Sequence, residues 1–274
     1  MAMRGGAARE ADKPARTLDR ANPYASVARA LAGTPFSRIL YRESTESTND
    51  DAAAMLGDDT ALGTTIVAEE QRRGAGRKGR TWIAPSHSAL LFTTILPREI
   101  STGDLWCLSF WVALCVRDAL HSLEIPGELQ WPNDILLGDR KLAGILCTSR
   151  VIAERSRAAC GVGINVHRFD GAEAEIAPAP AFCDDAAPVE RATLLLHVLN
   201  CFAMRLPLLD LPDHVARRWE REAGLPGRRY RLQRDGESEP FEGTAIALEP
   251  GGALIVERSG ARESVSLADA RVLR

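Results

Sequence analysis

A loop rich in glycine and arginine, closely followed by a proline, restricts the fold of this chain more than any other feature. The loop spans residues 74–80 and follows a β-rich run at 64–68. Its glycines fit the G-x-G-x-x-G pattern of dinucleotide-binding folds, and residues 74–81 nearly fit the phosphate-binding loop of nucleotide hydrolases. Both patterns require a helix that starts at the loop. Pro85 does not permit a long helix there, so we expect neither fold.

The charges of the same loop indicate an anion. Five cationic residues lie between Arg72 and Arg80, in a chain whose formal net charge is -3. Glycine lets backbone N–H groups approach a ligand closely, and arginine can bind carboxylate or phosphate with two parallel hydrogen bonds. The loop therefore predicts an anion-binding site. From the loop alone, a solvated basic patch that contacts nucleic acid stays open as the alternative. The overall charge argues against a protein whose whole surface binds nucleic acid.

Hydrophobic periodicity predicts both strands and helices before residue 224 and only strands after it. We expect strands at 38–42, 64–68, 90–96, 129–131, 135–137, 141–148 and 159–166, and helices at 49–56, 105–120, 189–209 and 214–222. Thr48 with Asp51 has the spacing of a capping box, and Ser101 or Thr102 is expected to cap the helix at 105–120. Residues 171–188 show no packing pattern and are expected to form a loop. Five short β runs, at 229–233, 241–248, 253–258, 263–267 and 271–273, predict a small barrel.

The chain shows no secretion signal and no metal-ligand pattern. Its first residues are polar, and no run of 18 apolar residues occurs, so we expect neither secretion by a signal peptide nor a membrane span. No two of the six cysteines are spaced C-x-x-C, and the five histidines are scattered. This pattern is typical of reduced thiols in a cytoplasmic protein rather than of disulfides or a zinc site. Residues 1–36 are expected to form an N-terminal tail with one helix near 23–31.

Four further segments place polar side chains where structure alone does not require them. Three small polar residues stand at a predicted helix start, Ser47, Thr48 and Asn49. Gln71 comes just before the loop, and Trp82 just after it. A tight turn with the sequence Trp-Pro-Asn-Asp occupies residues 131–134, and a lysine, Lys141, begins an apolar strand.

In this order the segments resemble those of the biotin protein ligases, also called biotin–[acetyl-CoA-carboxylase] ligases. The resemblance rests on Ser-Thr-Asn at 47–49, Gln to Trp at 71–82, Trp-Pro-Asn-Asp at 131–134, Lys-Leu-Ala-Gly-Ile-Leu at 141–146 and Gly-x-Gly-Ile-Asn at 161–165. It covers residues 38–168 strongly and the C-terminal part weakly. It implies an α/β (α+β type) fold similar to class II aminoacyl-tRNA synthetases, with a mixed, mainly antiparallel sheet flanked by helices. The catalytic domain would span residues 37–224, and a small SH3-like β-barrel would span 225–274.

The resemblance also implies a two-step reaction. Biotin and ATP, with Mg²⁺ bound largely through the phosphates, would give biotinyl-5'-AMP and pyrophosphate. The biotinyl group would then pass to one lysine of the biotin carboxyl carrier protein or domain of a biotin-dependent carboxylase. The carboxylate of biotin itself attacks phosphorus, so the enzyme needs positioned cations and hydrogen-bond donors rather than a nucleophile.

Carried over position by position, the resemblance names thirteen candidate residues. Lys141 and Arg77 would be catalytic and would contact both substrates. The other residues for biotin would be Ser47, Thr48, Asn49, Gln71, Ala75 and Gly76. The other residues for ATP would be Lys78, Arg80, Trp82, Asn133 and Asn165. Thr48 could equally serve as a helix cap, Trp82 as core filler, and the two asparagines as turn and strand-end residues.

Some expectations come from departures and open alternatives. Ala75 stands where many relatives have arginine, so one charge is lost. About 36 residues precede the catalytic core, too few for the DNA-binding domain of larger relatives, and we expect no DNA binding. A homodimer through edge strands at 141–147 or 159–166 is possible. A lipoyl or octanoyl ligase of the same fold, and a nucleic-acid-binding protein that uses the basic loop, are the competing functions.

Overall fold

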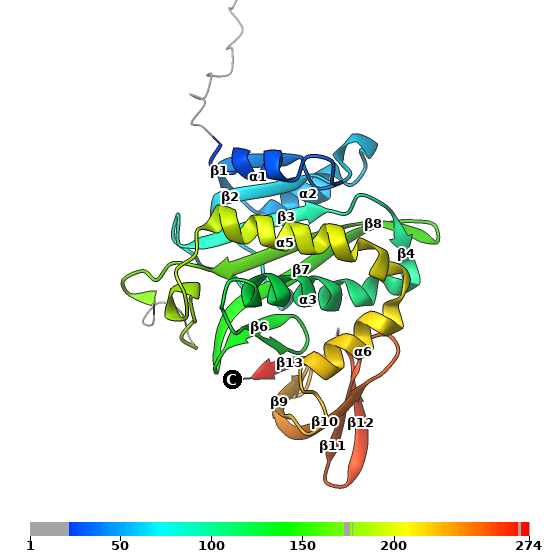
Figure 1. The fold of residues 1–274 in the computed structure, drawn as a ribbon. Helices are drawn as coiled ribbons and strands as arrows, with labels where there is room; N and C mark the ends of the chain where they lie inside the picture. The colour runs from blue at the N-terminus through cyan, green and yellow to red at the C-terminus, as the bar shows by residue number, and fades with distance from the viewer. Residues whose placement is uncertain (1–21, 173–175, 177, 268–269, 274) are drawn as a thin grey trace, which may run out of the picture.

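The computed structural model describes residues 22–172, 176, 178–267 and 270–273. It consists of an α/β unit with a large sheet and, below it in Figure 1, a smaller C-terminal sheet. The elements follow the order expected from the sequence, with strands and helices interspersed first and strands alone at the end.

The large sheet is mixed and mainly antiparallel, as expected. Its strands are ordered β1 (Ile39–Thr45), β2 (Thr65–Gln71), β3 (Ala89–Ile95), β8 (Arg155–Asn165), β7 (Arg140–Ile152), β6 (Asp134–Leu137) and β5 (Glu128–Gln130), and β4 (Ile100–Ser101) pairs with β8. Strands β1 and β2 run parallel, and the remaining pairs are antiparallel. The predicted strand at 159–166 is not an edge, because β8 lies between β3 and β7. Strand β7 pairs with β6 only through Gly144, and its second half pairs with β8 alone among the described residues.

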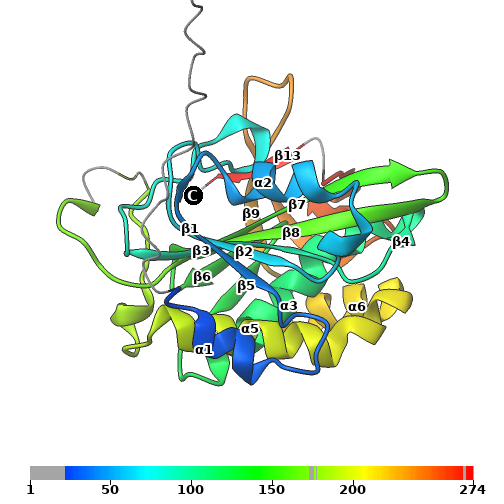
Figure 2. The same cartoon turned by 90° about the horizontal axis from the view of Figure 1, so that it is seen from above.

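Helices cover both faces of this sheet (Figure 2). Helices α1 (Ala25–Ala30), α3 (Leu108–His121) and α5 (Arg191–Arg205) lie on one face, and α2 (Thr48–Met55) lies on the other. The core between α3, α5 and the sheet contains most of the buried apolar side chains, whereas a small separate cluster lies under α2. Short 3-10 turns connect these elements: η1 (Asp59–Ala61), η2 (Arg77–Gly79), η3 (Thr102–Cys107), η4 (Cys183–Asp185) and η5 (Leu206–Asp210).

The predicted helix caps are wrong in their details. Ser47, not Thr48, is the N-cap of α2, and its hydroxyl oxygen accepts from the backbone N–H of Asn49. Neither Ser101 nor Thr102 caps through its side chain, because the chain first makes the 3-10 turn η3 and α3 begins only at Leu108. The Thr102 hydroxyl lies 2.9 Å from that of Ser156 instead.

The expected N-terminal tail is shorter than predicted. The helix near residues 23–31 is present as α1, and Tyr24, Val27, Leu31 and Phe36 are buried in the main core. This packing contradicts a tail boundary at residue 36, since residues 22–36 belong to the α/β unit. Residues 1–21 lie outside the described part of the chain.

The long helix expected at 189–209 is divided near Pro207 into α5 and η5. Residues 191–210 together are long and apolar enough, by length and composition, to cross a membrane, with a mean hydropathy of 1.6. Core packing explains this composition, because Leu194, Leu195, Val198 and Phe202 are fully buried in the main core.

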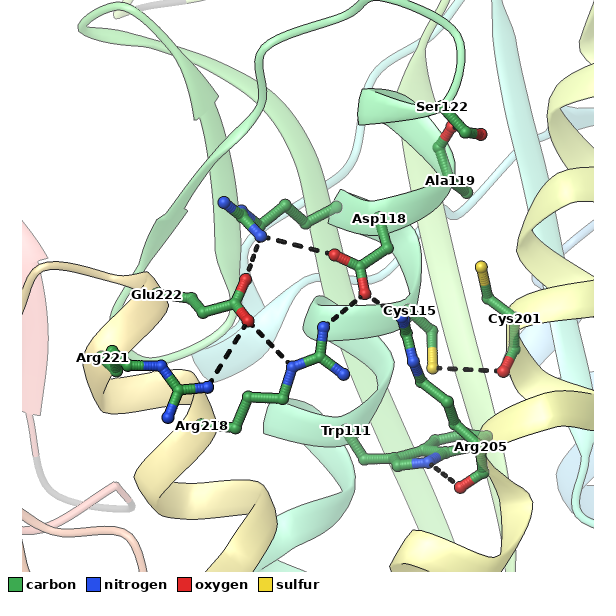
Figure 3. Close-up of polar contacts among 11 residues, drawn as sticks. Trp111, Cys115, Asp118, Ala119, Ser122, Cys201, Arg205, Arg218, Arg221 and Glu222 are labelled. Carbon is green, nitrogen blue, oxygen red and sulfur yellow. Dashed lines mark hydrogen bonds and ion pairs between the residues drawn. The ribbon is translucent and has the colours of Figure 1, made fainter.

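Helix α6 (Pro212–Glu222) leads to the C-terminal sheet and is attached to α3 and α5 by a network of charges (Figure 3). Asp118 accepts from Arg218 at 2.8 Å and pairs with Arg205, while Glu222 accepts from Arg218 at 2.9 Å and pairs with Arg117. Burial alone would raise the pKa of Glu222, but the hydrogen bond from Arg218 and the charge of Arg117 lower it. The network fixes the helix that carries the second sheet.

The C-terminal sheet has five antiparallel strands, as expected. They are β9 (Arg229–Arg234), β10 (Phe241–Leu248), β11 (Leu254–Arg258), β12 (Ala261–Val265) and β13 (Ala270–Leu273). Their order is β12-β11-β10-β9-β13, so β12 and β13 are the two ends of the hydrogen-bonded ladder in the described residues. The turn between β10 and β11 docks on the α/β unit, where the Trp131 indole donates to the carbonyl of Gly252 at 3.3 Å. A Cβ on Gly252 would lie 2.7 Å from the Phe110 ring, which shows how closely the two parts pack.

Candidate functional site

A pocket enclosing about 1100 Å³ of empty space, part of it open to solvent, lies over the paired strands β7 and β8. Its walls come from the start of α2, the end of β2, the glycine–arginine loop and the Trp-Pro-Asn-Asp turn. Twelve of the thirteen residues predicted from the sequence line this pocket: Ser47, Thr48, Asn49, Gln71, Ala75, Gly76, Arg77, Arg80, Trp82, Asn133, Lys141 and Asn165. Lys78 does not line it.

One end of the pocket is a closed hydrogen-bond network. The Gln71 side-chain oxygen accepts from the backbone N–H of Thr48 at 2.7 Å and from its hydroxyl at 2.9 Å. The buried hydroxyl of Thr93 lies 2.8 Å from the hydroxyl of Thr48 and 2.7 Å from the side-chain oxygen of Asn49. The Gln71 amide nitrogen and the Ser47 hydroxyl proton are the groups left to donate to a ligand, because a hydroxyl that accepts keeps its own donor. This polar corner suits a small group that has both carbonyl and N–H functions.

Asn49 attaches this corner to the sheet. Its Nδ2 donates to the carbonyl of Leu146 at 3.0 Å, across 97 residues of sequence. A Cβ on Gly161, which pairs with Leu146, would lie 2.0 Å from Asn49 Oδ1. Any side chain at position 161 would displace Asn49, so glycine is required there.

Next to this corner the sheet carries a bare strip made by two paired glycines, Gly144 and Gly163. The indole of Trp82 packs directly on them, since a Cβ on Gly144 or Gly163 would approach that ring to 3.0 Å or 2.8 Å. The Trp82 Nε1 is buried and has no hydrogen-bond partner in the protein. Trp82 therefore forms an apolar wall of the pocket.

Lys141 is held beside this wall by a carboxylate. Its Nζ lies 2.7 Å from Asp134 Oδ1 and 5.4 Å from the centre of the Trp82 ring. Strands β6 and β7 bring the two residues together, since Leu136 and Lys141 are register partners. Asn165 Nδ2 donates to the Lys141 carbonyl at 3.2 Å, and Asn133 Nδ2 donates to that of Ile145 at 2.6 Å. The two asparagines thus hold the backbone of β7 at two points, at Lys141 itself and four residues further along.

Arg77 supplies the second cation of the pocket. Its guanidinium donates to Asn133 Oδ1 at 3.3 Å and to the carbonyl of Leu267, which lies between β12 and β13 of the C-terminal sheet. Burial lowers the pKa of Arg77, although a guanidinium stays charged in proteins. Lys78 turns away from the pocket and forms a 2.6 Å ion pair with Asp235 of the turn between β9 and β10. The loop that carries both cations is therefore held by the second sheet.

Several lining residues were not predicted from the sequence. Asp134 belongs to the Trp-Pro-Asn-Asp turn that the sequence singled out, but its pairing with Lys141 depends on the register of β6 and β7. Gly144, Gly161 and Gly163 occur in the matched motifs, but their close contacts depend on strand register. Pro180 and its neighbours were assigned to a loop without packing, which is wrong for this part: Ala181 donates to the Lys141 carbonyl at 2.8 Å, and Ala181, Phe182 and Cys183 are buried.

The site combines a polar corner, an apolar strip and two cations in one pocket. Such an arrangement can hold an amphipathic ligand whose anionic end meets Lys141 and Arg77, and it can bring a second anion to the same cations. In the described residues no group of three or more His, Cys, Asp or Glu side chains could hold a metal ion.

Part of this chain is similar to known protein ligases. The pattern of the biotin/lipoate A/B protein ligase family matches residues 41–165. The bifunctional ligase/repressor BirA of Bacillus spizizenii is 26% identical over 240 residues, which cover 84% of this chain and 73% of that protein. The biotin–[acetyl-CoA-carboxylase] ligase of Paracoccus denitrificans is 36% identical over 128 residues, 44% of this chain and 52% of that one.

The fold is also that of solved biotin protein ligases. The structure of the Aquifex aeolicus biotin protein ligase in complex with biotin and ATP superposes with a TM-score of 0.70 at 22% identity, over 87% of this chain and 100% of that one. Residues 41–165 of this chain therefore resemble the biotin/lipoate A/B protein ligase family, and the fold agrees with that resemblance.

Proposed function

We propose that this protein is a biotin protein ligase, which activates biotin with ATP to biotinyl-5'-AMP and transfers the biotinyl group to a lysine of the biotin carboxyl carrier protein of acetyl-CoA carboxylase. The observation that carries the proposal is the position of Lys141. Its ammonium group is held by Asp134 and Trp82 inside a pocket that also contains Arg77 and the polar corner. The name of the Paracoccus denitrificans relative and the biotin complex of the Aquifex aeolicus ligase support biotin as the substrate.

In the first step, a carboxylate oxygen of biotin attacks the α-phosphorus of ATP, and the bond to the pyrophosphate oxygen breaks. The two reactants are both anions, so their approach needs fixed positive charge. Lys141 would bridge the carboxylate and the α-phosphate, and Arg77 would stabilise the charge that develops on the phosphate. Groups of this kind typically contribute about 10²–10³ in rate each.

The polar corner would bind the ureido ring of biotin. That ring has one carbonyl and two N–H groups, which must find partners when they are buried. The Ser47 hydroxyl and the Gln71 amide can donate to the carbonyl, and oxygens of the same network can accept from the N–H groups. The apolar remainder of biotin would lie against Trp82, because the indole itself covers the strip of Gly144 and Gly163.

In the second step, the acceptor lysine amine attacks the acyl carbon and loses a proton, and AMP leaves. The acyl adenylate reacts readily with water, so it must be shielded until the carrier arrives. The loop at 72–82, whose Trp82 covers the glycine strip, is placed to provide this shield.

Magnesium would enter with ATP and neutralise charge on its phosphates. In the described residues no group of three or more His, Cys, Asp or Glu side chains could hold the ion, so its ligands would come largely from the phosphates and from water.

The remaining expectations stay predictions. All six cysteines lie in the described part of the chain and are free thiols, which supports a cytoplasmic location. The possible homodimer and the expected absence of DNA binding need direct measurement. Of the competing functions, lipoyl transfer is not favoured, because the Paracoccus denitrificans and Aquifex aeolicus relatives are both named as ligases of biotin.

The test is biotin-dependent exchange of radioactive pyrophosphate into ATP. We expect the wild type to catalyse exchange with biotin and not with lipoate. Lys141→Ala should lose about 10²–10³ in rate, whereas Arg73→Ala, in the same loop but outside the pocket, should behave as wild type. No exchange by the wild type would contradict the proposed function, and full activity of Lys141→Ala would contradict only the role of Lys141.

A further inference from the structure

Two cysteines face each other on neighbouring strands directly beside the pocket. Cys147 of β7 and Cys160 of β8 are register partners, and the next pair along these strands is Leu146 and Gly161. Both residues of that next pair line the pocket. Any change in the spacing of the two cysteines therefore occurs one residue away from the pocket lining.

Opposite residues in an antiparallel ladder form either hydrogen-bonded or non-hydrogen-bonded pairs, and the second kind has the shorter Cα separation. The backbone hydrogen bonds show that the two cysteines form a non-hydrogen-bonded pair. The N–H of Ile145 points away from β8, because it donates to Asn133. The carbonyl of Ala158 points away from β7, because it accepts from Leu96 of the β3 side. Since these groups alternate in direction along a strand, Cys147 and Cys160 also direct their backbone groups away from each other.

Such non-hydrogen-bonded pairs have Cα atoms about 4.5 Å apart and side chains on the same face. A disulfide requires a Cα separation of about 4.4–6.8 Å. The backbone of β7 and β8 thus already holds the two thiols at a distance that a covalent bond can span.

The two thiols differ in access. Cys160 is fully buried, and hydrogen bonding to Cys147 together with burial raises its pKa well above the usual value. Cys147 is half-buried and lines a second cavity, which also contains Arg77 and Trp106. A small oxidant can therefore reach Cys147 first, with Cys160 next to it as the resolving thiol.

We propose that Cys147 and Cys160 form a reversible intramolecular disulfide on exposure to hydrogen peroxide, and that this bond impairs the adjacent pocket. The Cys147 thiolate sulfur attacks one peroxide oxygen and breaks the O–O bond, which gives a sulfenic acid and hydroxide. The Cys160 sulfur then loses its proton and attacks the Cys147 sulfur, and the second oxygen leaves as hydroxide. With the two thiol protons, the products are one disulfide and two water molecules.

The disulfide would shorten the distance between β7 and β8 next to a tightly packed part of the site. A disulfide brings Cβ atoms to about 3.8 Å, closer than the roughly 4.5–5.5 Å of an ordinary cross-strand pair. The neighbouring Leu146 carbonyl and Gly161 are both in contact with Asn49, and even one added carbon at position 161 would collide with it. Closing the strands therefore displaces Asn49 and the polar corner.

The first test is chemical and does not depend on the proposed function. The full-length protein is treated with hydrogen peroxide, digested without reduction and analysed by mass spectrometry. We expect a peptide that links Cys147 to Cys160 and disappears on treatment with dithiothreitol. Oxidation of Cys147 to higher acids with no linked peptide at any peroxide concentration would overturn the proposal.

The second test measures the effect on the pocket and rests on the proposed function. Biotin-dependent pyrophosphate exchange should fall by roughly tenfold on oxidation, because small displacements of positioning groups cost large factors in rate, and dithiothreitol should restore it. Cys147→Ser and Cys160→Ser should each resist this loss, and Cys183→Ser should lose activity as the wild type does. If the buried Cys160 variant fails to fold, the half-buried Cys147→Ser variant decides alone. Equal reversible loss in Cys147→Ser would overturn the proposed effect.

Discussion

The two sides of the pocket are built in different ways. The sheet side consists of β7, β8 and the start of α2, where three glycines bring backbone and side chains into close contact. A partly buried hydrogen-bond network there links Asn49, Thr93 and Gln71 through Thr48. The loop side, residues 72–82, packs on the sheet through Trp82 and is otherwise held by its own short bridge between Ala75 and Thr81 and by contacts with the C-terminal sheet. One side is fixed throughout by packing, and the other by one packed indole and a few polar contacts.

This difference suggests a division of work. Recognition of a small rigid ring needs groups that do not move, which a packed sheet provides. Covering a reactive intermediate needs a segment that can open, and segments with few buried contacts open at low cost in free energy. The variants below test whether the two sides differ as proposed.

The largest effect is expected on the sheet side, for Gly161→Ala. The new Cβ would lie 2.0 Å from Asn49 Oδ1, so Asn49 and its bonds to Leu146 and Thr93 must shift. We expect biotin-dependent pyrophosphate exchange to fall by about 10²-fold or more, mainly through a higher KM for biotin. Gly103→Ala is the matched control, because its Cβ would meet nothing closer than 3.7 Å. Normal exchange by Gly161→Ala would show that the sheet side is not rigid.

How much of this site the sequence could predict depends on the range of the contacts. Lys141, Asn133 and Gln71 could be chosen because each stands in a short local motif. The pairing of Lys141 with Asp134 depends on the register of β6 and β7, which local patterns do not determine. The same holds for the glycine strip under Trp82, which needs β7 and β8 to align Gly144 with Gly163.

Contacts between residues far apart in the chain could not be predicted from the sequence at all. Arg77 meets Leu267 across 190 residues, and only the docking of the C-terminal sheet brings the two together. The burial of Tyr24 and Phe36 was missed for a similar reason, since a short polar-rich segment shows its apolar face only when a partner is present. The fold class needed only periodicity and the resemblance, and it is confirmed.

An intermediate effect is expected on the loop side for Arg77→Lys. Lysine keeps the charge but loses the planar group that contacts Asn133 and Leu267 together. We expect exchange to fall by roughly tenfold, with a larger change in kcat than in the KM for biotin, because transition-state charge is affected more than the ureido site. Arg73→Lys serves as the control. If instead the KM for biotin rises by roughly tenfold and kcat stays unchanged, Arg77 acts in biotin binding together with the sheet side.

The smallest effect is expected for the ion pair between Lys78 and Asp235, which links the loop to the second sheet outside the pocket. The Asp235 side chain is 60% exposed and that of Lys78 21%, and exposed pairs contribute about 0–1 kcal/mol. Asp235→Ala should therefore raise the KM for ATP by at most about fivefold at low salt, and less at high salt because exposed charges are screened. Reversing both charges, with Lys78→Asp and Asp235→Lys together, should restore the KM, whereas each reversal alone should impair it. If the double reversal is no better than the single ones, the C-terminal sheet does not hold the loop through this ion pair. The contact that couples the loop to that sheet is then the one between Arg77 and Leu267.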